Sequence, residues 1–89
     1  MGNIQGELEF EITPEMDKCI DILGNNGWYI DVEPGVIHFY DYGRISVEIT
    51  EDELIFISKE GDFMSRPIDK YTLIGVLVEF HQLPLNYKS

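Results

Sequence analysis

The chain has 89 residues, and 44% of them are hydrophobic, which is typical of a folded domain rather than a disordered chain. Seventeen acidic residues face six basic ones, which gives a formal net charge of −11. Such a chain is repelled by nucleic acid and anionic membranes and attracted to basic protein surfaces, so the charge argues against nucleic-acid binding and membrane association. The alternative is that the acidity only keeps a small protein soluble.

The length allows one hydrophobic core, and we expect a single domain over residues 7–84, a loose N-terminus over 1–6 and a C-terminal tail over 85–89. No apolar run approaches the roughly 20 residues of a membrane span. The first residues lack the basic and apolar regions of a secretory signal, and Cys19 is the single cysteine, which rules out an internal disulfide. These features predict a cytoplasmic protein.

The first predicted element is a strand over residues 7–12, where apolar residues alternate with glutamates. A short helix follows, with Thr13 as its N-cap and Pro14 in its first turn. Apolar residues at helical spacing form one buried stripe, namely Met16, Cys19, Ile20 and Leu23. We expect this helix to end in a left-handed cap at Gly24.

Three strands joined by tight turns are predicted over residues 28–49. In each strand, apolar side chains alternate with polar ones, so one face packs into the core and the other faces water. Turn residues at 34–35 and 41–43 connect these strands. The continuous apolar run Leu54–Ile57 predicts a central strand, and residues 63–68 fit either an edge strand or an irregular segment.

The last predicted element is a long helix that starts near Asp69 and ends before Pro84, since apolar residues return to helical spacing. Short connections between the middle strands require an antiparallel meander. The predicted fold class is α+β, with a single twisted antiparallel sheet of about five or six strands. The order is strand, helix, four or five strands, helix. We expect both helices to pack on one face of the sheet, with the last helix across the sheet centre. The other face of the sheet should be largely exposed to solvent.

No catalytic or metal-binding pattern is present in the sequence. Phosphate-binding glycine loops, nucleophile elbows and zinc spacings are all missing. His38 and His81 have no nucleophile placed beside them, so we interpret them as structural. Cys19 lies on the apolar stripe of the first helix and is interpreted as a buried hydrophobe. We expect no enzymatic activity, no cofactor and no metal.

The candidate site is the exposed face of the sheet, where tyrosines lie among carboxylates. Aromatic side chains anchor protein interfaces, and carboxylates steer a basic partner. In the predicted first strand, glutamates would also recur about 6.6–7 Å apart, similar to successive phosphates of a nucleic-acid strand. The predicted binding residues are Glu7, Glu9, Glu11, Tyr29, Asp31, Glu33, Tyr40, Asp41, Tyr42 and Glu48.

The sequence therefore predicts a small acidic protein-binding module, a non-enzymatic inhibitor or decoy that binds a basic, nucleic-acid-handling protein. In size and acidity the chain is similar to phage-encoded nucleic-acid mimics, anti-CRISPR proteins and the immunity proteins of nuclease toxins, a likeness of composition alone. The alternative is a small assembly protein that homodimerises through a sheet edge or a sheet face. Its support is the apolar run Leu54–Ile57 and the uncertain strand near Phe63.

Overall fold

The first helix begins where the sequence supplies a cap. In the computed structural model, which describes residues 8–87, helix α2 spans Pro14–Asn25. Thr13 Oγ1 accepts a hydrogen bond from a backbone N–H of the first turn at 3.2 Å, which confirms the predicted N-cap. The helix continues through Gly24, and Gly27 takes the left-handed conformation instead, with a φ of 93°. The predicted cap at Gly24 is therefore wrong by a few residues.

Five strands form one antiparallel sheet in the order β1-β2-β3-β4-β5, so strands that follow one another in the chain are neighbours in space. Their bounds are Tyr29–Glu33 for β1, Val36–Tyr40 for β2, Ser46–Ile49 for β3, Leu54–Ile57 for β4 and Phe63–Arg66 for β5. The ambiguous segment after residue 62 is thus an edge strand. Together with the helices, this sheet confirms the predicted α+β fold.

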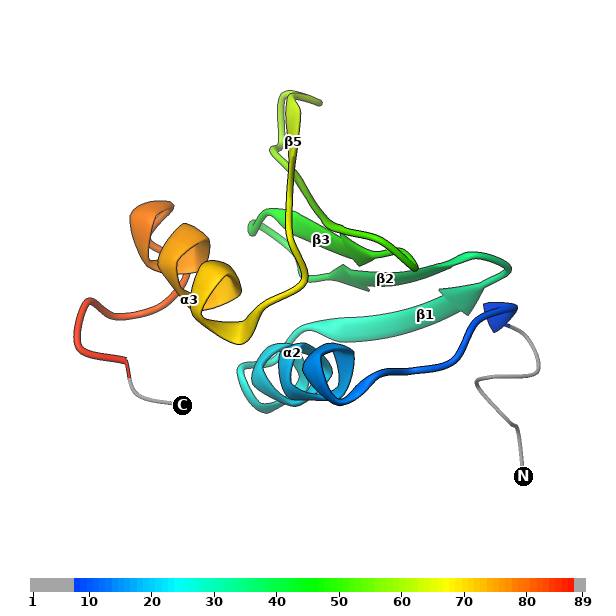
Figure 1. Cartoon of the computed structure of the whole chain (residues 1–89). Helices are drawn as coiled ribbons and strands as arrows, with labels where there is room; N and C mark the ends of the chain where they lie inside the picture. Colours follow the sequence, from blue (N-terminus) through cyan, green and yellow to red (C-terminus); the bar gives the residue numbers. More distant parts are fainter. Residues whose placement is uncertain (1–7, 88–89) are drawn as a thin grey trace.

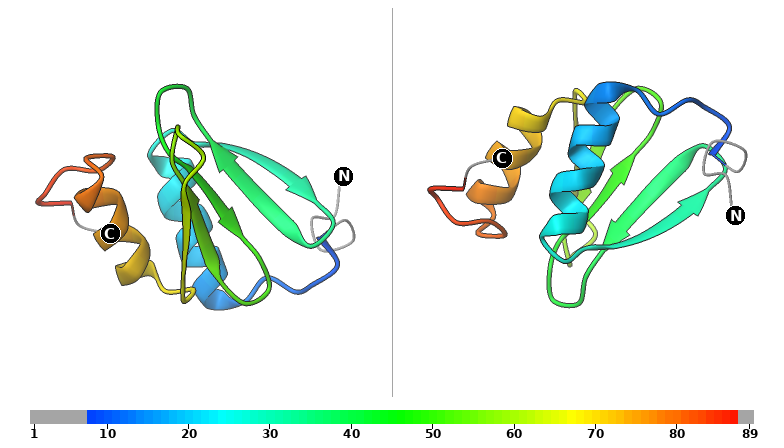
Figure 2. Two further views of the ribbon diagram at one scale, coloured as in Figure 1. Left: turned by 90° about the horizontal axis from the view of Figure 1, so that it is seen from above. Right: turned by 90° about the horizontal axis from the view of Figure 1, so that it is seen from below.

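The two helices cover the same face of the sheet. The sheet twists strongly, so β5 stands almost upright against β1 in Figure 1. Helix α2 lies under the sheet, and α3 (Lys70–Glu79) lies beside α2 towards β5, as the views from above and below agree (Figure 2). No helix of the described residues covers the opposite face. The sheet centre is therefore covered by α2, and the prediction that the last helix lies there is wrong.

Helix α3 is also shorter than the sequence predicts. Asp69 caps it as expected, since its carboxylate accepts from a backbone N–H of the first turn at 2.9 Å. The helix ends at Glu79 rather than just before Pro84. His81 has a left-handed backbone with a φ of 61°, and the next two amides fold back to donate to the Leu77 carbonyl. These bonds give a carbonyl at the C-terminal end of the helix its hydrogen-bond donors, and the chain changes direction after them.

Residues 8–12, the described part of the strand predicted over 7–12, do not form a strand. Glu9 has a φ of 73°, which an extended strand does not allow. Leu8 is nevertheless buried, and its carbonyl accepts from the Gly35 N–H at 2.7 Å, which fastens the segment to the β1–β2 turn. A strand of alternating glutamates beside β1 would place like charges against the acidic residues of β1, and such pairs are destabilising. We attribute the irregular path of this segment to that repulsion.

The hydrophobic core lies between the sheet and the two helices. It includes the predicted inward residues of the three middle strands, namely Ile37, Phe39, Val47, Ile49, Leu54 and Phe56. Trp28 is also buried, and its Nε1 donates to the Ile45 carbonyl at 3.1 Å. Ile30 points to the helix side but stays 46% exposed, because β1 is an edge strand. The core thus fixes which sheet face is left for binding.

Candidate protein-binding surface

Six side chains of β1, β2 and β3 share the sheet face that the helices leave open. In the register of β1 with β2, Tyr29 faces Tyr40 and Asp31 faces His38. His38 also faces Glu48 on β3. Directly paired residues point to the same side of a sheet, and Glu33 shares that side by the two-residue repeat of β1. We call this set the open-face cluster: Tyr29, Asp31, Glu33, His38, Tyr40 and Glu48.

The imidazole of His38 sits between two carboxylates of the open-face cluster. Its Nδ1 lies 2.8 Å from a carboxylate oxygen of Glu48, and its Nε2 lies 3.3 Å from one of Glu33. A neutral imidazole has a single N–H donor, so both contacts are attractive only when the ring is protonated. The three side chains therefore lie in contact with one another on the sheet face.

The two tyrosines of the cluster form an aromatic pair. The ring centroids of Tyr29 and Tyr40 are 5.6 Å apart, and the ring planes are tilted by 34°. Both side chains are exposed. Aromatic pairs at this separation are favourable beyond their buried area, so the rings hold each other in place while offering a flat surface to a partner.

Between these groups the twisted sheet forms a hollow of about 260 Å³, which Ser46 and Ile57 also line. The strands place no lysine or arginine on this face, and His38 is its basic side chain. Arg66 is the single Lys or Arg within the five strands, and its register partner Leu54 is buried on the helix side. The open-face cluster therefore combines three carboxylates and two tyrosines with one basic group, the imidazole of His38.

Arg44 precedes β3 but turns away from the open face. Its guanidinium lies over the Trp28 ring, 3.3 Å from the ring centroid, and donates to the Asn26 carbonyl at 2.8 Å and the Gln82 carbonyl at 3.0 Å. It also lies 3.1 Å from a carboxylate oxygen of Asp41. The predicted site residue Asp41 is thus paired within the chain, with only 23% of its side chain exposed, and it stands apart from the cluster.

The remaining predicted binding residues also lie outside the cluster. Tyr42 is 89% exposed in the connection between β2 and β3 and does not line the hollow. Glu9 and Glu11 are exposed, but they lie in the irregular segment, so the expected even spacing of a carboxylate stripe is wrong for them. Glu7 lies outside the described residues. The structure brings together five of the predicted residues, Tyr29, Asp31, Glu33, Tyr40 and Glu48.

His38 is the member of the cluster that sequence reasoning missed as a site residue. The signal that could have found it was the alternation of β2, which puts His38 on the same face as Tyr40. The carboxylates of Glu33 and Glu48 converge on the His38 imidazole. Among residues 8–87, no group of three or more metal-ligating side chains could hold a metal ion.

Cys19 is buried in α2, which confirms its interpretation as a small hydrophobe. Burial raises the pKa of the Cys19 thiol from 9.0 to about 12, and the nearby carboxylates of Glu15 and Asp69 add to the effect. Since the thiolate is the nucleophilic form, this thiol is unreactive in the folded protein.

Comparison with protein families, with curated proteins and with solved structures found no match to this chain. Over the part of the chain that the structure describes, neither helix has the length and apolar character needed to cross a membrane. The assignment of a function therefore depends on the geometry of the surface itself.

Proposed function

We propose that this chain is a small protein-binding module, a non-enzymatic inhibitor or decoy that binds a basic site on a nucleic-acid-handling protein. The open-face cluster carries the proposal, because it combines three carboxylates with a tyrosine pair on a sheet face to which the strands add no lysine or arginine. The net charge of −11 supports a cationic partner. The proposed setting is the cytoplasm, where a single thiol such as Cys19 stays reduced.

The cluster offers two kinds of contact to a basic partner. The carboxylates of Asp31, Glu33 and Glu48 can accept hydrogen bonds from lysine or, in bidentate geometry, from arginine. The faces of the tyrosine rings can stack on a guanidinium. A protein site that holds nucleic-acid phosphates presents the same cationic groups, so a protein that covers it with carboxylates competes with nucleic acid.

The rigidity of the surface supports this function as well. The cluster stands on three hydrogen-bonded strands, and His38 lies in contact with two of its carboxylates. A surface that is ordered before binding loses less conformational entropy when the partner arrives. Tyrosine side chains add contact area at a low entropic cost.

The test compares two triple variants that remove the same number of negative charges. The cluster variant carries Asp31→Asn, Glu33→Gln and Glu48→Gln. The control variant changes exposed acids elsewhere and carries Asp21→Asn, Glu51→Gln and Glu79→Gln. Each protein is immobilised and exposed to lysate of the native cell at low and high salt, and bound proteins are identified by mass spectrometry. Melting curves of both variants verify that they remain folded.

We expect the wild type and the control variant to retain the same nucleic-acid-handling protein at low salt and to release it at high salt. An exposed charge pair contributes roughly 0.5–1 kcal/mol, so losing three should weaken binding of the purified partner by about tenfold or more. Added nucleic acid should displace the chain. Equal losses in both variants would mean that overall charge, and not the cluster, governs binding, and the proposal would then fail.

A second candidate function, self-assembly, rests on a different observation. Among the described residues, strand β5 pairs with β4 alone, and Phe63 on this edge is 76% exposed. An unpaired edge can accept a strand from a second copy. This function predicts a dimer that salt strengthens, because salt screens the repulsion between two chains that each carry a charge of −11. Sedimentation equilibrium at two salt concentrations separates this function from basic-partner binding, which salt weakens.

A further inference from the structure

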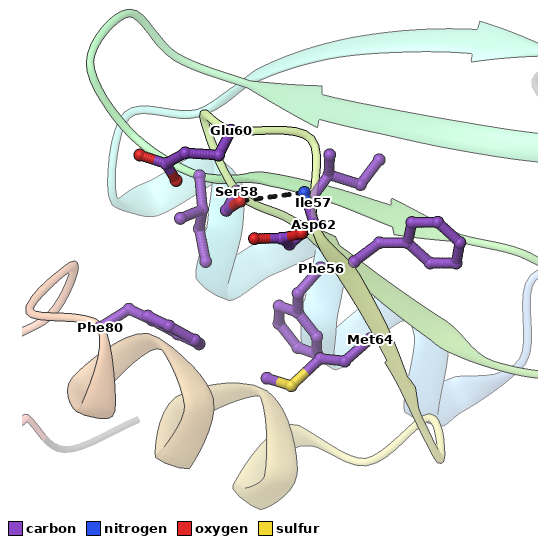
Figure 3. Close-up of a pocket in the computed structure, with 9 residues that line it drawn as sticks. Phe56, Ile57, Ser58, Glu60, Asp62, Met64 and Phe80 are labelled. Carbon is purple, nitrogen blue, oxygen red and sulfur yellow. Dashed lines mark hydrogen bonds between the residues drawn. The ribbon is translucent and has the colours of Figure 1, made fainter.

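A second hollow lies between the β4–β5 hairpin and the C-terminal end of α3. It has a volume of about 350 Å³. Figure 3 shows Phe56 and Met64 directed from the hairpin towards Phe80, which comes from the end of α3. We call this space the hairpin groove and define it by its apolar lining residues Ile45, Phe56, Ile57, Phe63, Met64 and Phe80.

The base of the hairpin groove is apolar and buried, and its sides are apolar and exposed to solvent. Phe56 and Ile45 at its base are buried, whereas Phe80 is 43% exposed and Phe63 is 76% exposed. Large apolar side chains that border one hollow mark an interaction site more often than scattered ones do. The volume is near the lower end of the range for small-ligand sites, roughly 300 Å³ upward, which suits one large side chain.

The rim of the groove is acidic. Glu60 and Asp62 line it in the turn between β4 and β5, and Ser58 Oγ accepts from the Asp62 N–H at 3.2 Å. Of the described residues that line the groove, none is a lysine or arginine, although Lys59 lies in the same turn. Carboxylates around an apolar floor complement an apolar side chain that has basic neighbours.

The hairpin groove and the hollow of the open-face cluster have one lining residue in common. Ile57 lines both the hollow of the cluster and the groove. The free edge of β5 runs along the groove, with Phe63 and Met64 on that strand. An extended segment can add to such an edge through backbone hydrogen bonds and insert alternate side chains into a neighbouring pocket. A second copy of this chain is disfavoured as the occupant, because both copies carry a charge of −11.

We infer that the hairpin groove holds one large apolar side chain of an extended, lysine- or arginine-rich segment of the partner protein. The segment pairs with the edge of β5, its apolar side chain lies against Phe56, Met64 and Phe80, and its basic residues face Glu60 and Asp62. This inference rests on the proposed function, since it assigns the segment to the same cationic partner.

The experiment uses the full chain with nitrogen-15 throughout and carbon-13 in the methionine methyl groups. Met64 lines the groove, whereas Met16 is buried in α2 and serves as an internal reference. A Met64→Leu variant assigns the signal. The probe is a short synthetic peptide with a Leu-Phe-Leu centre and lysines on both sides. One control peptide replaces the centre with alanines, and another replaces the lysines with glutamates.

We expect the Met64 methyl signal to move and saturate with the lysine-flanked Leu-Phe-Leu peptide while the Met16 signal stays in place. Neither control peptide should move it. Phe80→Ala should weaken binding by about tenfold, as for an interface anchor. The matched control Tyr71→Ala removes an exposed aromatic of α3 that does not line the groove and should leave binding unchanged.

A Met64 signal that stays fixed at millimolar peptide, or that moves equally with the alanine-centred peptide, would overturn the inference. So would a shift on raising the protein concentration without peptide, since a second copy would then occupy the groove. The backbone amide signals of His38 and Glu48 report on the open-face cluster in the same sample. If these move and Met64 does not, the groove is not the site and the proposed function stands. If Met64 alone moves, the peptide occupies the groove without contacting the cluster, and the lysate comparison of the two triple variants then decides the role of the cluster.

Discussion

Replacement of Arg44 should destabilise the whole fold, although the residue lies near the surface. Its guanidinium donates to the carbonyls of Asn26 and Gln82 and to the Asp41 carboxylate, and it stacks on Trp28. One side chain therefore ties together the end of α2, the β2–β3 connection and the chain after α3. The side chain is 23% exposed, so each contact is partly screened by water.

The expected magnitude follows from these contacts. We take about 1 kcal/mol for each of the three partly exposed hydrogen bonds and about 0.5–1 kcal/mol for the ring contact. Arg44→Ala should then lower the free energy of unfolding by about 3–4 kcal/mol, with some loss of additivity because the contacts share one group. In a domain of this size that corresponds to a fall in Tm of about 12 °C or more.

Urea denaturation followed by the fluorescence of Trp28, the single tryptophan, measures this loss. Arg44→Lys is the matched control, because it keeps the charge but not the planar fork of donors, and its loss should be about half as large. A loss below about 1 kcal/mol for Arg44→Ala would refute the reasoning, since the value would be that of an ordinary surface side chain.

Three further outcomes test the packing. Leu77→Ala removes a fully buried side chain of α3 and should cost about 2–5 kcal/mol in urea denaturation, whereas a negligible loss would mean that α3 is not docked. Gly75→Ala lies on the exposed side of α3, where an added Cβ meets nothing within 4 Å, and should raise the free energy of unfolding by about 1 kcal/mol; a loss would indicate a contact that the structure lacks. Cys19 should resist alkylation in the native state and react readily in urea. Because its pKa rises from 9.0 to about 12 on folding, its contribution to stability is present below pH 9 and is lost as the pH rises towards 12; rapid native labelling at pH 8 would contradict this.

Local sequence signals were sufficient for most of the fold. Thr13 and Asp69 begin the helices because their side-chain oxygens cap free backbone N–H groups. Alternation predicted the middle strands because their partners lie next to them in the chain. The same alternation failed over residues 8–12, since a strand also needs a partner edge, and the acidic outer side of β1 does not favour one bearing glutamates.

The candidate site was predictable where one tight turn determines it. A two-residue turn at 34–35 fixes the register of β1 with β2, so the pairing of Tyr29 with Tyr40 follows from the sequence. The direction of the Arg44 side chain cannot be predicted from the sequence in this way, because it depends on contacts with Trp28 and with the chain after α3. The hairpin groove was not predictable either, since it forms only where α3 ends beside β5.

The position of Ile57 between the two hollows has a consequence for affinity. Under the proposed function, a partner captured by the cluster would hold its neighbouring segment close to the groove, so that the second encounter would be intramolecular. For sites joined by a short connection the effective concentration is on the order of millimolar, and avidity exceeds either affinity without any new contact. Two individually weak patches on an 89-residue chain can thus produce one long-lived complex.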